Sequence, residues 1–270
     1  MQPVLADITV VEVGQSPAAG LAAMVMADFG ARVVWFEYGQ RSESYRVWHR
    51  GKERVSVDLA PGSSRADTHA QLIREHVLAS ADVFLTDLGS QRLGQLGLDW
   101  STLSALRADL IYAEVSAFGD NNAYSTLAAD GERGMPKESL VAAAIGRMML
   151  FEGVAKRPGP VYSALRVGTH GASQATLTGI LAQLLARAKG AIGQPQKMSI
   201  LRAPTFYDLV ALGASQLDES PLPEVSRLEV LPILNFQPVQ CADGRWMQLG
   251  NLLPHLQVNF LKAVGLTDIL

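Results

Sequence analysis

The chain opens with short β-branched runs on either side of an alanine-rich segment. Residues 8–13 (Ile-Thr-Val-Val-Glu-Val) are typical of a strand buried on both faces. After a turn containing glycine and proline, residues 18–29 place large apolar side chains among alanines, which predicts a helix packed closely on a sheet. Gly30 marks the end of this helix, and residues 32–37 predict the next strand. This succession predicts a βαβ unit with parallel strands and a right-handed crossover.

The same alternation continues along most of the chain and predicts an α/β fold with a Rossmann-like parallel sheet. Further strands are expected at 55–59, 83–86, 110–115 and 197–201, and helices at 70–79, 100–108, 138–151, 169–187 and 204–217. The aperiodic stretch 118–137, rich in glycine and small polar residues, predicts a long loop of the kind that often carries function. After Asp218 the pattern changes: several prolines precede an Asp-Gly turn between two short strands, which predicts a hairpin, and 254–264 predicts a last helix.

Composition narrows the class of protein. With 270 residues, 48% of them hydrophobic, the chain can bury the core of one large domain or two modest ones. Its net charge is −3 without a long basic block, which does not indicate binding to nucleic acid or an anionic membrane. A single cysteine, Cys241, argues against a disulfide framework or a cysteine-based zinc site. Without a secretion signal or a long apolar span, we expect a soluble cytoplasmic protein.

The turn after the first strand is the first candidate ligand site. Gly14 and Gly20, together with Glu37 at the end of the second strand, resemble part of a dinucleotide site. The G-x-G-x-x-G pattern is absent, however, and Pro17 stands where the loop should approach a pyrophosphate, so NAD is not expected as a cofactor. A tight turn with Pro17 near the first helical position explains these residues without a ligand. An open α/β sheet still binds its ligand beyond the carboxyl ends of its strands, so the turn should line a pocket.

Five segments, in order along the chain, resemble the family III CoA-transferases, the carnitine, bile-acid and formyl-CoA transferase group that is related to α-methylacyl-CoA racemase. The segments are Ala-Asp-Phe-Gly-Ala-Arg-Val-Val-Trp-Phe-Glu (27–37), Arg-Gly-Lys (50–52) with 55–59, Leu-Gly-Leu (96–98) with 110–112 and 116–119, the apolar helix 177–187 with Gly190, Gly193 and Gln194, and Cys-Ala-Asp-Gly-Arg-Trp (241–246). The resemblance implies coenzyme A or acyl-CoA as substrate, a free carboxylic acid as the second small-molecule partner, and neither metal nor NAD.

The resemblance also implies a nucleophile. Such enzymes carry an aspartate at the start of the helix after the Phe-Gly loop, and here the matching position in Lys-Glu-Ser-Leu-Val-Ala-Ala-Ala-Ile-Gly (137–146) is Glu138. A sub-branch with glutamate is also similar at 157–162 (Arg-Pro-Gly-Pro-Val-Tyr) and at Thr169-His170. A carboxylate can attack a thioester because the enzyme thioester that results is close in energy to the substrate. Alternatively, Glu138 is an acidic residue that simply favours a helix N-terminus.

Other site residues follow from the same resemblance. His170 is the second candidate catalytic residue, and the candidate CoA-binding residues are Val13, Gly14, Gln15, Arg50, Lys52, Gly119 and Asp120. His170 would exchange protons near the thioester carbonyl, or it is only a polar residue at a helix start. Arg50 and Lys52 would bind the CoA phosphates, or they are solvated surface cations.

The chain departs from the family pattern in two places. Asp-Leu-Gly-Ser-Gln (87–91) replaces an Asn-Phe-Arg-Pro-Gly run, and Asp87 would repel a phosphate. Relatives continue beyond the position of Leu270, so we expect 1–218 to form the CoA-binding large domain and 219–270 a linker and the beginning of a smaller, apparently truncated α+β domain. The resemblance implies an interlocked homodimer. Three functions remain open: CoA transfer through an enzyme carboxylate, racemisation or epimerisation of an acyl-CoA by α-proton exchange, and an inactive CoA-binding remnant.

Overall fold

The computed structural model describes residues 2–39, 45–119, 166–191, 193–203, 238–251 and 253–269. Its main feature is a six-stranded parallel sheet with the order β3-β2-β1-β4-β5-β6. The strands are β1 (Thr9–Val13), β2 (Arg32–Glu37), β3 (Glu53–Ser56), β4 (Val83–Thr86), β5 (Ile111–Ser116) and β6 (Gln196–Ser199). Because the strand order reverses between β1 and β4, the carboxyl ends of these two strands form the topological switch point where such sheets bind ligands.

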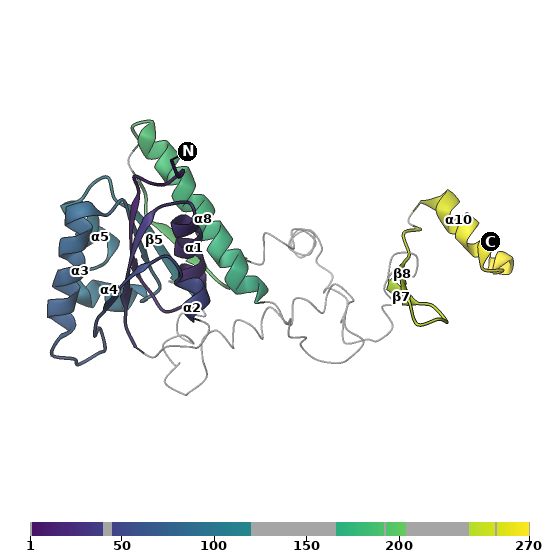
Figure 1. The fold of residues 1–270 in the computed structure, drawn as a ribbon, viewed down its shortest axis with the longest axis horizontal. Helices are drawn as coiled ribbons and strands as arrows, with labels where there is room; N and C mark the ends of the chain where they lie inside the picture. Colours follow the sequence, from purple (N-terminus) through teal and green to yellow (C-terminus); the bar gives the residue numbers. More distant parts are fainter. Residues whose placement is uncertain are drawn as a thin grey trace, which may run out of the picture. The chain divides into compact units, whose positions relative to one another are not determined.

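Helices cover both faces of this sheet (Figure 1). One face carries α1 (Pro17–Asp28), α2 (Tyr45–Trp48) and α8 (Val167–Ala188), and the other carries α3 (Ala66–Ser80), α4 (Ser90–Leu96) and α5 (Trp100–Leu106). Buried alanines on α1 let this helix lie close to α8 and the sheet. Strand side chains such as Val13, Phe36, Phe84 and Tyr112 form the core beneath α3–α5.

Two helix starts follow directly from local sequence. Ser16 is the N-cap of α1 and Pro17 opens the helix, where a missing backbone N–H has no consequence. Asp99 caps α5 by accepting a hydrogen bond from the Thr102 backbone N–H at 3.1 Å. Gly30, just beyond α1, has φ +98°, a left-handed conformation that ends the helix and turns the chain into β2.

The structure confirms the predicted α/β fold and the opening βαβ unit. Strand and helix ends differ from the prediction by a few residues; the third strand, for example, is Glu53–Ser56 rather than 55–59. The short helices α2 and α4 were not predicted because neither is long enough to show a helical period. The predicted loop 118–137 lies mostly, and the predicted helices at 138–151 and 204–217 lie entirely, outside the described residues.

The chain divides into two compact units, Met1–Ile145 with Tyr162–Leu212 and Gly146–Val161 with Gly213–Leu270. In the second unit, β7 (Pro238–Gln240) and β8 (Trp246–Gln248) form the predicted antiparallel hairpin, and α10 (Pro254–Ala263) and the 3₁₀ turn η4 (Thr267–Ile269) follow. The predicted domain boundary at 218 stays a prediction. Within the described ranges no helix is long and apolar enough to cross a membrane, and no three histidine, cysteine or acidic residues could together hold a metal ion.

Candidate functional site

The candidate site lies at the carboxyl edge of the sheet, where β1 and β4 end side by side. Val13 pairs with Thr86, and the Thr86 hydroxyl donates a hydrogen bond to the Val13 carbonyl at 2.8 Å. The chain then leaves β1 through Gly14 and Gln15 into α1, and leaves β4 through Asp87. The first turn and Asp87 therefore face each other across the switch point.

Asp87 holds the start of α1 through its carboxylate. Its oxygens accept hydrogen bonds from the backbone N–H of Gln15, at 2.9 and 3.1 Å, and from the backbone N–H of Ser16. The Tyr38 hydroxyl, at the end of β2, donates to Asp87 Oδ1 at 2.9 Å. A β-carbon on Gly14 would lie 3.3 Å from Asp87 Oδ2, so a glycine lets the carboxylate approach this closely. Burial and the Asp87 charge raise the pKa of Tyr38 well above its ordinary value, which keeps this hydroxyl a donor.

A buried polar cluster supports the first turn from the α1 side of the sheet. The Trp35 indole N–H donates to the Gly14 carbonyl at 2.8 Å, and the ring stacks on His49 with centroids 3.6 Å apart. Lys52 Nζ lies 2.6 Å from Glu12 Oε2, and both side chains are fully buried. The same ammonium lies 2.9 Å from a carbonyl of α1 and 3.1 Å from His49 Nδ1, so all three of its N–H groups have partners.

Burial shifts the ionisation of this cluster. It raises the pKa of Glu12 and lowers that of Lys52, while the opposite charge of each residue partly offsets the shift of the other. Burial and the nearby Lys52 charge lower the pKa of His49 to about 3, so this imidazole is neutral at pH 7. As Nδ1 accepts from Lys52, the ring proton is on Nε2. The cluster is a structural ion pair inside the fold.

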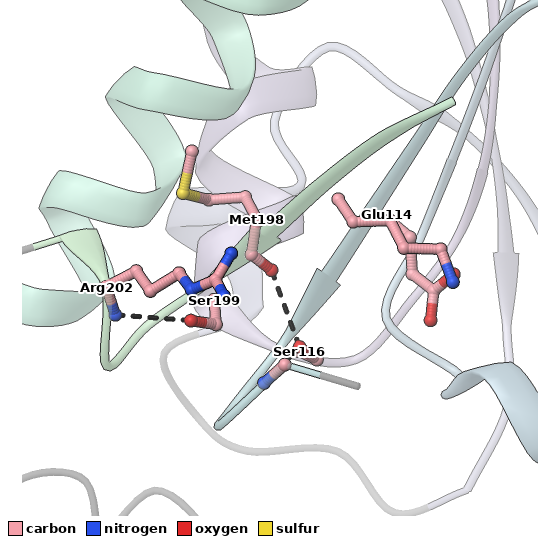
Figure 2. A pocket seen from close by; sticks show the side chains of 7 residues that line it. Glu114, Ser116, Met198, Ser199 and Arg202 are labelled. Atoms are coloured by element: carbon pink, nitrogen blue, oxygen red, sulfur yellow. Dashed lines mark hydrogen bonds and ion pairs between the residues drawn. The ribbon is translucent and has the colours of Figure 1, made fainter. Parts of the chain in front are cut away.

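Two neighbouring hollows open at the carboxyl edge. The first, of about 440 Å³, is lined by residues at or just beyond the ends of five strands: Gln15, Ser16, Tyr38, Asp87, Val115, Ser116, Ala117 and Ile200. The second, of about 210 Å³, lies where β5 and β6 end and is lined by Glu114, Ser116, Gly119, Lys197, Met198, Ser199 and Arg202 (Figure 2). Ser116 belongs to both hollows. The edge can thus accommodate a ligand larger than either hollow.

The second hollow differs from the first in its charges. Glu114 is buried and accepts a hydrogen bond from the Ser90 hydroxyl at 2.6 Å, with Lys197 Nζ at 3.7 Å from its other oxygen. Arg202 also lines this hollow, and its backbone N–H donates to the Ser199 hydroxyl at 3.2 Å, as Figure 2 shows. In the second hollow the negative charge of Glu114 is accompanied by the cations Lys197 and Arg202. In the described lining of the first hollow the charged side chain is Asp87.

The structure brings some of the predicted site residues together. Val13, Gly14 and Gln15 lie at the first turn, and Gln15 lines the first hollow. Gly119 lines the second hollow, and its backbone N–H donates to the Ser116 hydroxyl at 2.9 Å. His170 is exposed near the start of α8 and lines neither hollow. Glu138 and Asp120 lie outside the described residues.

The two predicted phosphate-binding cations have other surroundings. Arg50 pairs with Asp28 at the end of α1, at 2.5 Å. That helix end adjoins the amino edge of the sheet, whereas the hollows lie at the carboxyl edge. A five-residue strand such as β1 spans roughly 17 Å, so Arg50 is about that far from the hollows. Lys52 is buried against Glu12 rather than solvated, and a phosphate could reach its ammonium only by displacing that carboxylate. The geometry does not place either cation at the site.

Sequence reasoning missed Tyr38 and Ser116 and saw Asp87 only as a charge that would repel phosphate. Each of the three follows or ends a buried parallel strand. That position was the available signal, because residues at the carboxyl ends of such strands share one edge.

Comparisons with known proteins agree with this architecture. A sequence model of CoA-transferase family III matches residues 5–270. The succinyl-CoA–D-citramalate CoA-transferase of Chloroflexus aurantiacus is 25% identical over 286 residues, which cover 98% of this chain and 66% of that protein. The α-methylacyl-CoA racemase of Mus musculus is 25% identical over 264 residues, which cover 97% of this chain and 65% of the racemase. The chain thus spans just under two thirds of the length of these two relatives.

Solved structures share the fold. The protein Rv3272 from Mycobacterium tuberculosis has a TM-score of 0.73 at 20% identity, over 98% of this chain and 70% of that one. A CAIB/BAIF family protein from Brucella suis has a TM-score of 0.71 at 20% identity, over 99% of this chain and 71% of that one. The predicted α/β fold class is confirmed by these likenesses.

Proposed function

The chain belongs to CoA-transferase family III, since the family model covers residues 5–270, and on this premise we propose that it moves CoA from an acyl-CoA to a free carboxylic acid. The match over nearly the whole chain is the observation that carries the proposal. Two relatives with CoA-transferase names, from Chloroflexus aurantiacus and Clostridioides difficile, are 25% and 21% identical over most of the chain. The two hollows along the carboxyl edge of the sheet supply a place for a ligand of this size class.

The proposed mechanism uses the Glu138 carboxylate as nucleophile. It attacks the thioester carbonyl, the C–S bond breaks, and a Glu138–acyl anhydride and a CoA thiolate form. The thiolate attacks the Glu138 carbonyl of the anhydride, which releases the first acid and leaves a glutamyl-CoA thioester. The acceptor carboxylate then attacks this thioester and expels the thiolate, which attacks the acceptor carbonyl and restores Glu138. No redox partner is required, and every bond that forms replaces one that breaks.

The other predicted residues have binding and positioning roles in this proposal. Val13, Gly14, Gln15, Gly119 and Asp120 are proposed to contact the CoA portion of the substrate. His170 is proposed to exchange protons near the carbonyl oxygen. Arg50 and Lys52 do not enter the proposal, because one lies at the other edge of the sheet and the other is held by Glu12.

Covalent trapping tests the proposal directly. The chain is incubated with succinyl-CoA, and the adduct is trapped with hydroxylamine or borohydride and located by peptide mass spectrometry. We expect a modification on Glu138 that is absent from Glu138→Gln, together with loss of CoA transfer to an added acid. The exposed Glu75→Gln serves as the matched control. CoA transfer that persists at the wild-type rate in Glu138→Gln would contradict the mechanism.

Acyl-CoA racemisation is the second candidate, because the mouse racemase is as similar to this chain as the first CoA-transferase. A racemase removes and returns the α-proton, so it exchanges that proton for deuterium in D₂O without forming a covalent adduct. Adduct formation favours transfer, and proton exchange without an adduct favours racemisation. If neither the adduct nor the exchange is observed, the chain is an inactive CoA-binding remnant. Homodimer formation is a further proposal, which light scattering of the purified chain tests.

A further inference from the structure

The first βα turn has the elements of an anion site. Backbone N–H groups at the start of a helix, together with the positive end of the helix dipole, bind phosphate in many α/β proteins. In this chain the N–H groups of Gln15 and Ser16 point to a carboxylate of the protein itself, that of Asp87. The Tyr38 hydroxyl adds a third donor to the same group. The position that could hold an external anion is filled from within.

The Asp87 carboxylate has little capacity left for a ligand. A carboxylate offers about four lone-pair sites. Gln15 N–H lies within hydrogen-bond distance of both oxygens, Ser16 N–H bonds to Oδ2, and Tyr38 bonds to Oδ1. The carboxylate is therefore anchored on three sides, and its charge remains at the wall of the first hollow.

The rest of this hollow contains nothing that would attract a phosphate. Its described lining includes no lysine, arginine or histidine. Beyond the first turn, Tyr38 and Asp87, its lining consists of Val115, Ser116, Ala117 and Ile200, of which three are apolar. A phosphate here would be repelled by the Asp87 charge and would lose hydration against apolar side chains. An uncharged group would have neither of these costs.

We propose that Asp87 is a specificity-determining residue: it occupies the anion position of the first turn, so the adjoining hollow admits an uncharged part of a ligand and rejects phosphate. The choice of ligand rests on the proposed function. If the ligand is an acyl-CoA, its uncharged, amide-containing arm between the thioester and the diphosphate suits the hollow. The diphosphate then lies outside it.

Titration with inorganic pyrophosphate tests the role of Asp87 without any turnover. Binding to the 270-residue chain is followed by ³¹P NMR or calorimetry for the wild type and for Asp87→Ala, which frees the N–H groups and removes the charge. We expect the variant to bind pyrophosphate at least roughly tenfold more tightly than the wild type, the effect of one charge-assisted hydrogen bond. Asp67→Asn, which removes an exposed carboxylate from α3, should leave binding unchanged.

Two further variants keep the test decisive. Asp87→Asn retains an oxygen for the Gln15 and Ser16 N–H groups and removes only the charge, so it decides the matter if the alanine variant does not fold. Tyr38→Phe keeps the charge and removes one donor, and it should gain no affinity for pyrophosphate. Pyrophosphate binding that is no tighter in a folded Asp87→Ala than in the wild type, or an equal gain in Tyr38→Phe, overturns the proposal. If only Asp87→Asn folds, removal of the charge alone must raise the affinity, and equal binding by this variant then overturns the proposed rejection of phosphate. Failure to trap an adduct on Glu138 would instead contradict the proposed function and leave this result standing.

Discussion

Replacing Lys52 by methionine should expose the cost of a lone buried charge. Lys52 and Glu12 are both fully buried, and their charged atoms lie 2.6 Å apart. Glu12 Oε1 already has no hydrogen-bond partner, so the variant leaves the whole carboxylate without its cation. Removing one member of such a pair typically costs about 3–5 kcal/mol of unfolding free energy. We expect Lys52→Met to fall in this range at pH 7.

The pH dependence of this loss follows from the raised pKa of Glu12. Without Lys52, burial favours the protonated form of Glu12 in the folded protein, whereas the unfolded chain ionises this carboxyl above its ordinary pKa of 4.5. The folded state therefore binds the extra proton, and its stability rises as the pH falls toward 4.5 and is lost as the pH rises. The difference between variant and wild type should shrink by up to about 1.4 kcal/mol for each pH unit between 7 and 5.

Urea unfolding, followed by tryptophan fluorescence at pH 7, 6 and 5, measures this difference. The double variant Glu12→Gln with Lys52→Met removes both charges and should recover part of the stability at pH 7. Arg50→Gln, which breaks an ion pair whose side chains are 51% and 42% exposed, is the control and should cost less than about 1 kcal/mol. A loss below about 1 kcal/mol in Lys52→Met, or a loss that does not change with pH, would refute the reasoning.

Three other variants test single features of the fold, each by chemical denaturation. Trp35→Phe leaves the buried Gly14 carbonyl without its donor and should cost about 1–3 kcal/mol. The pKa of His49 is lowered to about 3, so the folded state does not take up a proton that the unfolded chain accepts below about pH 6.5. Wild-type stability should therefore fall as the pH drops below about 6.5. The variant His49→Asn should make this decline smaller. Asp99→Ala removes the cap of α5 and should cost about 1 kcal/mol, whereas no change would show that the cap is dispensable.

Local sequence was sufficient for the architecture of the large sheet but not for its contacts. The β-branched runs, the Gly30 helix end and the Asp-Gly hairpin turn each specify a local structure within a few residues, and their order indicates a parallel sheet. The partners of Lys52 and Asp87 are another matter: Lys52 meets Glu12 across 40 residues, and Asp87 meets Gln15 across 72. Such pairings arise only when the strands assemble, so the same cation was equally compatible with a solvated surface or a phosphate.

Asp87 shows how a fold can keep its topology and change its ligand preference. A sheet with this strand order offers a helix N-terminus at its switch point, and the backbone donors there must be satisfied by something. A glycine-rich turn leaves them to a phosphate, whereas in this chain Gly14 lets a carboxylate from the neighbouring strand approach and satisfy them permanently. The absence of the dinucleotide pattern and the presence of Asp87 therefore belong together, because Asp87 binds the backbone donors that this pattern would leave for a phosphate. A charge that looked like a defect in phosphate binding instead stabilises the start of α1 and leaves the adjoining hollow to an uncharged group.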